Sequence, residues 1–385
     1  MKFARFVLFA LVFFTAVFSV PETGTAQQGI EYRFLFGPAN ELEPIAEAGT
    51  SLNTIFHDIY FKKLASHVPK KAAPYTETAW SVFWTYTFSL WPHEFGHWAR
   101  ANQAGGDFVI KGYNFPFPKA EMRLPLNMAP EYQSLSIVGG FEINTLMKRN
   151  AHTRFYRDGY AHAYELIHAF IQEVYYPFYA FVVTPADPVA PSTWTDTRGD
   201  PVESTLSVFK KHTGREPIRP DGTVDPKLVD LYRETIYMNL VWTLLDPMLY
   251  ESAKAFRADM STDYGRMEAR MFGGDRIAWI YGTEFNASPL GYELYFNNYL
   301  KLNGKLHILY LKTGRPYNNN GIGIEVPALY KRKNLTLGAS LDYWNQDIYG
   351  SGGAVSLGAS YRLYKGFGLL ADVCMNGIYC RETGR

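Results

Sequence analysis

The sequence has few charged residues and almost no net charge. Charged residues make up 19% of the 385 residues, and 38 Lys and Arg against 37 Asp and Glu leave a formal net charge of +1. A protein that binds nucleic acid through charge neutralises several phosphates with clustered Lys and Arg. We therefore expect no nucleic-acid partner. Hydrophobic residues make up 47% of the chain, which argues against global disorder.

Cysteine is scarce as well. The only two cysteines, Cys374 and Cys380, flank the pair Asn376-Gly377, which is a hairpin-turn signal. With a five-residue loop they would face each other and could form a disulfide. With a two-residue loop they would point to opposite faces of the hairpin, so the sequence leaves the bridge open. We assign no metal site to these cysteines.

The chain also lacks a long apolar run after its first residues. A bilayer-spanning helix needs about 20 consecutive apolar residues, and the uncharged stretch 78–92 is shorter than that. Residues 1–26 are typical of a signal peptide, because Lys2 and Arg5 precede the apolar run 6–20 and small residues occupy 24–26. An uncleaved anchor is the alternative. We expect an exported protein, in the periplasm or outer membrane of a bacterial envelope.

The length exceeds that of one typical domain of about 100–200 residues. Periodicity predicts helices over 76–100, 130–149, 158–184 and 228–260. Residues 185–226 are rich in Pro, Asp, Thr and Gly and indicate a long surface excursion. We predict a helical domain with a metal site over 27–275, including one short strand at 29–37, and an antiparallel β-domain over 276–385.

The β-domain is predicted from alternation with a period of two. Apolar residues alternate with small or polar ones over 335–344 and 354–363, and turn signals such as Asn303-Gly304 and Asn320-Gly321 separate the runs. This pattern predicts an α+β fold: a mainly helical domain followed by an antiparallel β-meander or partial barrel of six or seven strands. One interpretation is a sheet packed with one face on the helices. The other is a membrane-associated β-barrel with lipid outside, although such barrels need at least about eight strands.

One motif carries chemistry, His93-Glu94-Phe95-Gly96-His97. Two histidines four residues apart lie on one face of a helix and can bind one tetrahedral zinc ion. Glu94 would lie beside the metal and act as the general base for a zinc-bound water. This is the H-E-x-x-H constellation.

The third ligand is less clear, and Glu142 is the best candidate. It falls on an apolar helical stripe with Leu135, Val138 and Leu146, and a carboxylate on such a stripe must be paired or bound to a metal. Two neighbouring glycines, Gly139 and Gly140, would let another helix approach closely. The alternative is that Glu142 pairs with an Arg or Lys.

With a second helix supplying a glutamate, HEFGH resembles the HExxH zinc metallopeptidases, or zincins, of the gluzincin branch. The resemblance implies Zn²⁺ held by His93, His97 and Glu142, with Glu94 as the catalytic base. It does not extend further, because Arg100 and Gln103 replace the Gly and His of metzincins and Phe117 replaces the glutamate of the thermolysin-like spacing.

A fainter likeness is to site-2-type membrane proteases. Ala101 and Gly105 after HEFGH, the stretch 140–144 and the stretch 239–246 are similar to their motifs, which would make Asp246 the third ligand. Pro247 follows where that family has Gly, however. Asp246 before a proline also fits a helix N-cap with proline in the first turn.

The sequence thus predicts a zinc-dependent metallopeptidase, a hydrolase of the cell envelope that acts on a peptide or protein. The first alternative is a non-enzymatic envelope protein with a structural or fortuitous HExxH. The second is a site-2-type membrane protease. His162, His168, Tyr160 and Tyr164 are interpreted as structural residues or as groups that stabilise an oxyanion. Membrane association through the β-domain is a further expectation, and no oligomeric state is predicted.

Overall fold

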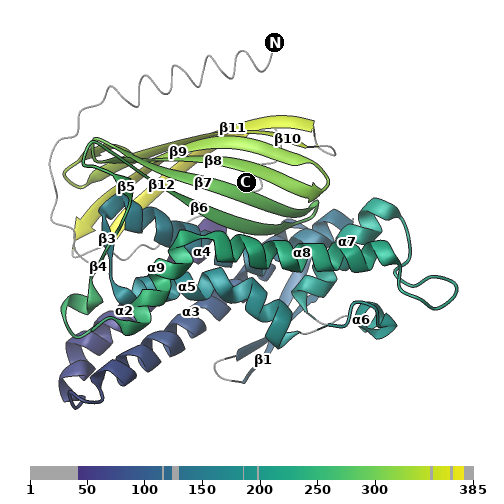
Figure 1. Cartoon of the computed structure of the whole chain (residues 1–385), viewed down its shortest axis with the longest axis horizontal. Helices are drawn as coiled ribbons and strands as arrows, with labels where there is room; N and C mark the ends of the chain where they lie inside the picture. Colours follow the sequence, from purple (N-terminus) through teal and green to yellow (C-terminus); the bar gives the residue numbers. More distant parts are fainter. Residues whose placement is uncertain are drawn as a thin grey trace, which may run out of the picture.

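The computed structural model describes residues 42–114, 117–123, 130–184, 186–196, 199–346, 350–364 and 367–376. The predicted signal peptide, the strand predicted at 29–37 and Cys380 lie outside this part of the chain. The fold is α+β, with helices first and an antiparallel sheet after them, as predicted. In Figure 1 the sheet forms one layer and the helices form a second layer beneath it.

The helical layer is built from long helices, and the sequence predicted most of them. The long helices are α2 Leu42–Ile59, α3 Ala73–Gln103, α4 Pro130–Asp158, α5 Ala163–Phe178, α7 Asp200–Thr213 and α8 Pro226–Leu245. Shorter ones are α6 Pro191–Thr195 and α9 Pro247–Lys254, and a π-helical turn, η3 Tyr179–Val183, extends α5. A hairpin of β1 Asp107–Asn114 and β2 Phe117–Arg123 follows α3.

The prediction of a long surface excursion over 185–226 was wrong. Helices α6 and α7 lie there, and Val202, Leu206 and Phe209 of α7 belong to the main hydrophobic cluster. The reason is that the prolines which indicated a loop stand in the first turns of helices, where proline is compatible with the backbone.

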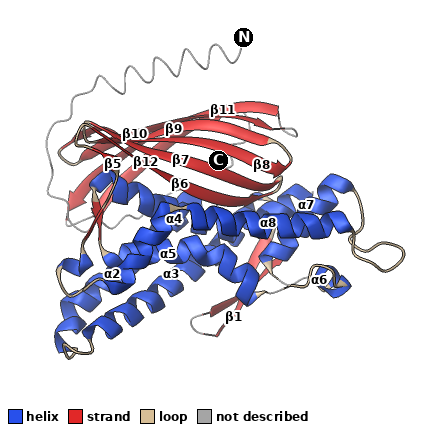
Figure 2. Ribbon diagram, viewed as in Figure 1, coloured by secondary structure: helices blue, strands red, loops and turns tan. Residues whose placement is uncertain are grey.

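The sheet is a meander in which each strand pairs with its neighbours in the sequence. Its strands are β5 Phe272–Gly273, β6 Ile277–Ser288, β7 Gly291–Leu302, β8 Lys305–Pro316, β9 Asn319–Arg332, β10 Leu335–Gln346, β11 Gly350–Tyr364 and β12 Phe367–Asn376. Figure 2 shows the long strands side by side over the helices. A separate two-stranded pair joins β3 Tyr160–Ala161 to β4 Met267–Glu268.

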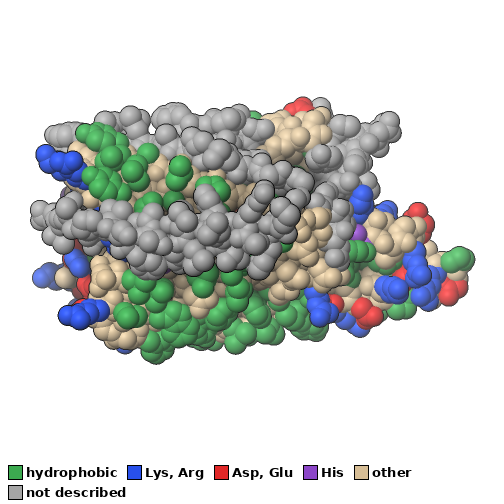
Figure 3. Space-filling model, turned by 90° about the horizontal axis from the view of Figure 1, so that it is seen from above, with side chains coloured by type: hydrophobic (Ala, Val, Ile, Leu, Met, Phe, Trp, Pro, Cys, Tyr) green, Lys and Arg blue, Asp and Glu red, His purple; other side chains and the backbone are tan. Residues whose placement is uncertain are grey.

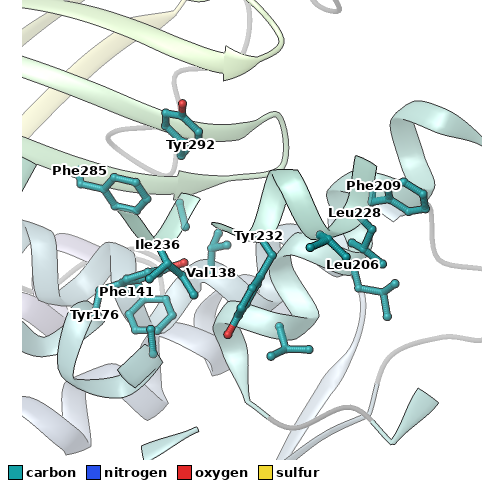
Figure 4. Packing of buried hydrophobic residues seen from close by; sticks show 14 of the residues in the cluster. Val138, Phe141, Tyr176, Leu206, Phe209, Leu228, Tyr232, Ile236, Phe285 and Tyr292 are labelled. Carbon is teal, nitrogen blue, oxygen red and sulfur yellow. The ribbon is translucent and has the colours of Figure 1, made fainter. Parts of the chain in front are cut away.

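The helices and the sheet share their hydrophobic core. The largest cluster joins residues of α4, α5, α7 and α8 to Phe285 of β6 and to Tyr292 and Leu294 of β7 (Figure 4). A second cluster joins α4 and α5 to Ile280 and Tyr299. The predicted boundary at 275/276 falls between β5 and β6, but the two parts pack as one unit across it.

Within the described residues, one helical stretch is long and apolar enough to cross a membrane. It is Ala163–Val183, and 56% of its most apolar window is buried inside the protein. A largely buried apolar helix is typical of a protein core, and this stretch contributes to both main clusters through residues such as Ile167 and Tyr176.

Candidate metal centre

Helices α3 and α4 cross at glycines next to the HExxH motif. A Cβ atom on Gly96 would lie 2.3 Å from the carbonyl oxygen of Gly139, and one on Gly139 would lie 2.5 Å from the oxygen of Gly96. Any larger residue would force the helices apart. A Cβ on Gly140 would lie 2.5 Å from the His93 ring. This confirms the close helix approach predicted at 139–140.

The crossing brings three potential ligand atoms to one point. The Nε2 atoms of His93 and His97 are 3.2 Å apart. Each also lies 3.2 Å from Oδ2 of Asp200, the first residue of α7. Both histidines are buried, whereas the Asp200 side chain is 14% exposed. These three residues form a group that could hold a metal ion.

The spacing of these atoms fits a tetrahedral metal. Zinc bonds of about 2.0–2.1 Å at tetrahedral angles place neighbouring ligand atoms roughly 3.3 Å apart. All three distances in the group are 3.2 Å. Three protein ligands in a tetrahedral arrangement leave one position open, which is the pattern of catalytic zinc sites.

Hydrogen bonds orient both imidazole rings. Nδ1 of His93 lies 2.7 Å from Oδ1 of Asn144, whose Nδ2 donates to Gln172 at 2.6 Å. Nδ1 of His97 lies 2.9 Å from the carbonyl oxygen of Ser136. Because oxygen atoms accept at both Nδ1 positions, each Nδ1 carries a proton, so that in the neutral ring the lone pair lies on Nε2 and is directed to the centre. Such partners fix the tautomer of metal-binding histidines.

The electrostatics of the site favour a positive charge between the rings. Burial alone lowers the pKa of His97, but the Asp200 carboxylate raises it to about 9. Burial alone raises the pKa of Asp200, but His97 and His93 lower it well below its usual value. The carboxylate is therefore ionised at neutral pH and stabilises a cation at the centre.

Glu94 lies beside this group without joining it. The residue is partly exposed, and its negative charge acts on His97, Tyr175 and Tyr179. The ring centroids of Tyr175 and Tyr179 lie 5.0 and 6.3 Å from the centroid of the His93 ring, so that the two tyrosines form one wall of the site. Glu94 is thus a carboxylate whose charge reaches the histidine pair but which is not part of the ligand group.

The structure places Glu142 away from the histidine pair, contrary to the ligand set predicted from the sequence. Its Oε2 accepts a hydrogen bond from Nε of Arg100 at 2.6 Å, and both side chains are buried. Arg100 follows His97 on α3 and also donates to Gln103 at 2.7 Å. The carboxylate on the apolar stripe is thus neutralised by an arginine, which was the alternative interpretation.

Asp246, the other candidate, is the N-cap of α9. Its side chain accepts from the backbone N–H of Met248 at 2.9 Å, which confirms the N-cap interpretation. Asp246 also forms a second buried group with His152 and Glu173. The Lys148 ammonium contacts Glu173, lies 3.2 Å from Asp246 and donates to the Thr283 carbonyl at 2.7 Å. A lysine already supplies the cation in this group.

The sequence reasoning missed Asp200 because it assigned 185–226 to the surface. A signal was present, since Asp200-Pro201 has the same form as Asp246-Pro247 and both open helices. His162 caps α5, and His168 is buried beside Asn53. Neither of the two metal-binding groups found in the described residues contains His162 or His168.

Comparison of the chain with known protein families, with curated proteins and with solved structures finds no match.

Proposed function

We propose that this protein is a zinc-dependent hydrolase, a peptidase of the cell envelope that cleaves peptides or proteins. One observation carries the proposal: three nitrogen and oxygen ligand atoms converge at 3.2 Å from one another, within reach of the negative charge of Glu94. The ligand set would be His93, His97 and Asp200. The HExxH spacing supplies two of these ligands and the base, and the start of α7 supplies the third.

Each residue has a distinct role in this proposal. A bound zinc ion would polarise the scissile carbonyl and lower the pKa of water to roughly 7. Glu94 takes the proton from the attacking water and passes it to the leaving amine. Asn144 and the Ser136 carbonyl hold the two imidazoles in the tautomer that presents Nε2. Tyr175 and Tyr179 exclude bulk water from one side of the site.

The first experiment measures the zinc content of the purified full chain. We expect about one zinc per wild-type chain and a loss of zinc in Asp200→Asn. Asp225→Asn is the matched control, because Asp225 also precedes a proline at a helix start and is buried, but it lies in another part of the fold. Retention of zinc in Asp200→Asn, with folding intact, would remove Asp200 from the ligand set.

The second experiment separates an enzyme from a protein with a structural metal. Glu94→Gln should keep its zinc and lose about 10²–10⁴-fold in cleavage of an unstructured protein substrate. Glu216→Gln, on the exposed loop after α7, should cleave like the wild type. If zinc-loaded wild type cleaves no faster than Glu94→Gln on any peptide or protein tested, the metal is structural and the peptidase proposal fails.

A further inference from the structure

The two faces of the sheet differ in polarity. Strand pairing places Glu284, Tyr295 and Lys312 in one row across β6, β7 and β8, on the face toward α4. Farther along the sheet the same face carries Tyr310 and Asp342, which both pair with Gly323. These polar side chains are buried or half-buried. We call this side the inner face.

The inner face is held together by polar contacts. Arg149 of α4 donates to Glu284 from Nε at 3.0 Å and also from Nη2. Farther across the sheet the hydroxyl of Tyr310 donates to Asp342, and Asn319 donates to Glu293. Charged and amide groups buried in this way need such partners.

The opposite side, which we call the open face, is apolar. At the β6–β7 edge it packs on α8 through Phe285 and Leu294. Beyond α8 it presents large exposed apolar side chains, 38–55% exposed: Trp279, Leu309, Leu311, Ile322, Leu357 and Tyr361. On the same face Ile324 and Leu341 pair across β9 and β10 within a small buried cluster.

The open face differs from the solvent face of a sheet that faces water. A half-buried antiparallel sheet normally turns its apolar side chains to the core and its polar ones to solvent. Here the inner face carries a row of buried polar groups beside the apolar core residues Ile280, Tyr299 and Ile308, whereas the open face carries large exposed apolar side chains. Apolar-out, polar-in alternation is the pattern of strands whose outer solvent is lipid.

Basic side chains lie at one end of the open face. The start of β6, the β7–β8 turn and the β9–β10 turn lie at the same end of the sheet and carry Arg276, Lys305, Arg332 and Lys333. In Figure 3 hydrophobic side chains are visible at the upper left and along the lower edge of the view, and charged side chains are visible at its left and right ends. Basic residues beside an apolar surface match anionic lipid headgroups.

We propose that the open face contacts the hydrocarbon of a lipid bilayer, with the basic turns at the level of anionic headgroups. The apolar surface continues onto the exposed side of α8 and α9, which carries Tyr237, Val241, Leu244, Leu245 and Tyr250. A single lipid layer would thus cover both the sheet and the helices that adjoin its first strand. The inference stands on the sheet alone and does not depend on the metal site.

The test uses the full chain, purified in mild detergent and mixed with phosphatidylcholine–phosphatidylglycerol vesicles that contain brominated acyl chains. Bromine quenches tryptophan fluorescence only at close range. Trp279 lies on the open face and Trp344 is buried on the inner face. We expect Trp279→Phe to lower the emission lost on quenching, measured per mole of protein, and Trp344→Phe to leave that loss unchanged. Equal quenching of the wild type and Trp279→Phe would overturn the proposal.

A flotation assay with the same vesicles gives an independent result. Leu311→Arg and Leu357→Arg place a charge in the middle of the open face, and each should lower binding about 30-fold or more if that position lies near the bilayer midplane. Val189→Arg, which changes an exposed aliphatic residue outside the sheet, is the control. Binding equal to wild type in folded open-face variants would refute lipid contact. A wild-type chain that does not bind vesicles and forms a dimer through Leu357 would show that a second copy of the chain covers this face, which would also refute lipid contact.

Discussion

Replacing Gly140 with alanine tests how tightly the metal centre depends on the α3–α4 crossing. The new Cβ would lie 2.5 Å from Cε1 and Nε2 of His93 and 2.7 Å from Cδ2. Ordinary carbon contacts need about 3.5–4.0 Å, so the ring must move by roughly 1 Å. Metal sites tolerate only about ±0.2 Å in ligand distances. We therefore expect zinc affinity to fall by at least about 10–100-fold, the range seen when ligand orientation is lost.

The assay is a competition titration against a zinc-binding dye, with circular dichroism to confirm folding. Overpacking should also cost about 1–3 kcal/mol of stability. Gly274→Ala is the matched control, because a Cβ atom on Gly274 would meet no heavy atom within 4 Å. Gly139→Ala should destabilise more, since its Cβ meets the backbone of Gly96. Unchanged zinc affinity in folded Gly140→Ala would refute His93 as a ligand held by this crossing.

Three further predictions concern groups around the centre. Asn144→Leu removes the acceptor for His93 Nδ1 and should weaken zinc binding by about 10–100-fold in the same titration. Arg100→Met leaves the buried Glu142 carboxylate unpaired and should cost about 3–5 kcal/mol in denaturant unfolding, much of it recovered when Glu142 also becomes Met. Burial lowers the pKa of His57 from 6.5 to about 4, so the unfolded chain binds the proton first as pH falls. This histidine should remove about 2 kcal/mol of stability between pH 7 and pH 5. His57→Gln should show a shallower pH dependence of unfolding, and an unchanged slope would contradict the assignment.

The elements with a clear period were predictable from the sequence. Helices α3 and α4 and the strands from Ile277 onward lie where the patterns of 3.6 and 2 placed them. The polarity of the sheet was not predictable, because alternation shows that two faces differ but not which one is buried. The buried face is defined by its packing on the helices, where Arg149 of α4 pairs with Glu284 and Ile280 and Tyr299 join the core.

The candidate site was predictable only where its residues are close in sequence. HEFGH fixes His93, Glu94 and His97 on one helix. The third carboxylate depends on how a distant segment packs, and Glu142 and Asp200 could not be ranked from local pattern. The structure separates the two candidates, because Arg100 pairs with Glu142 whereas Asp200 lies with the two histidines.

The position of Asp200 has a consequence for the stability of the chain. It lies 107 residues from His93, so an ion shared by the two would close a long loop as a cross-link does. In the chain-entropy model, closing a loop of about 100 residues destabilises the unfolded state by roughly 4–5 kcal/mol. Chelation of such an ion would then release the start of α7 from α3 and loosen the packing of α7 and α8 on the rest of the helical layer.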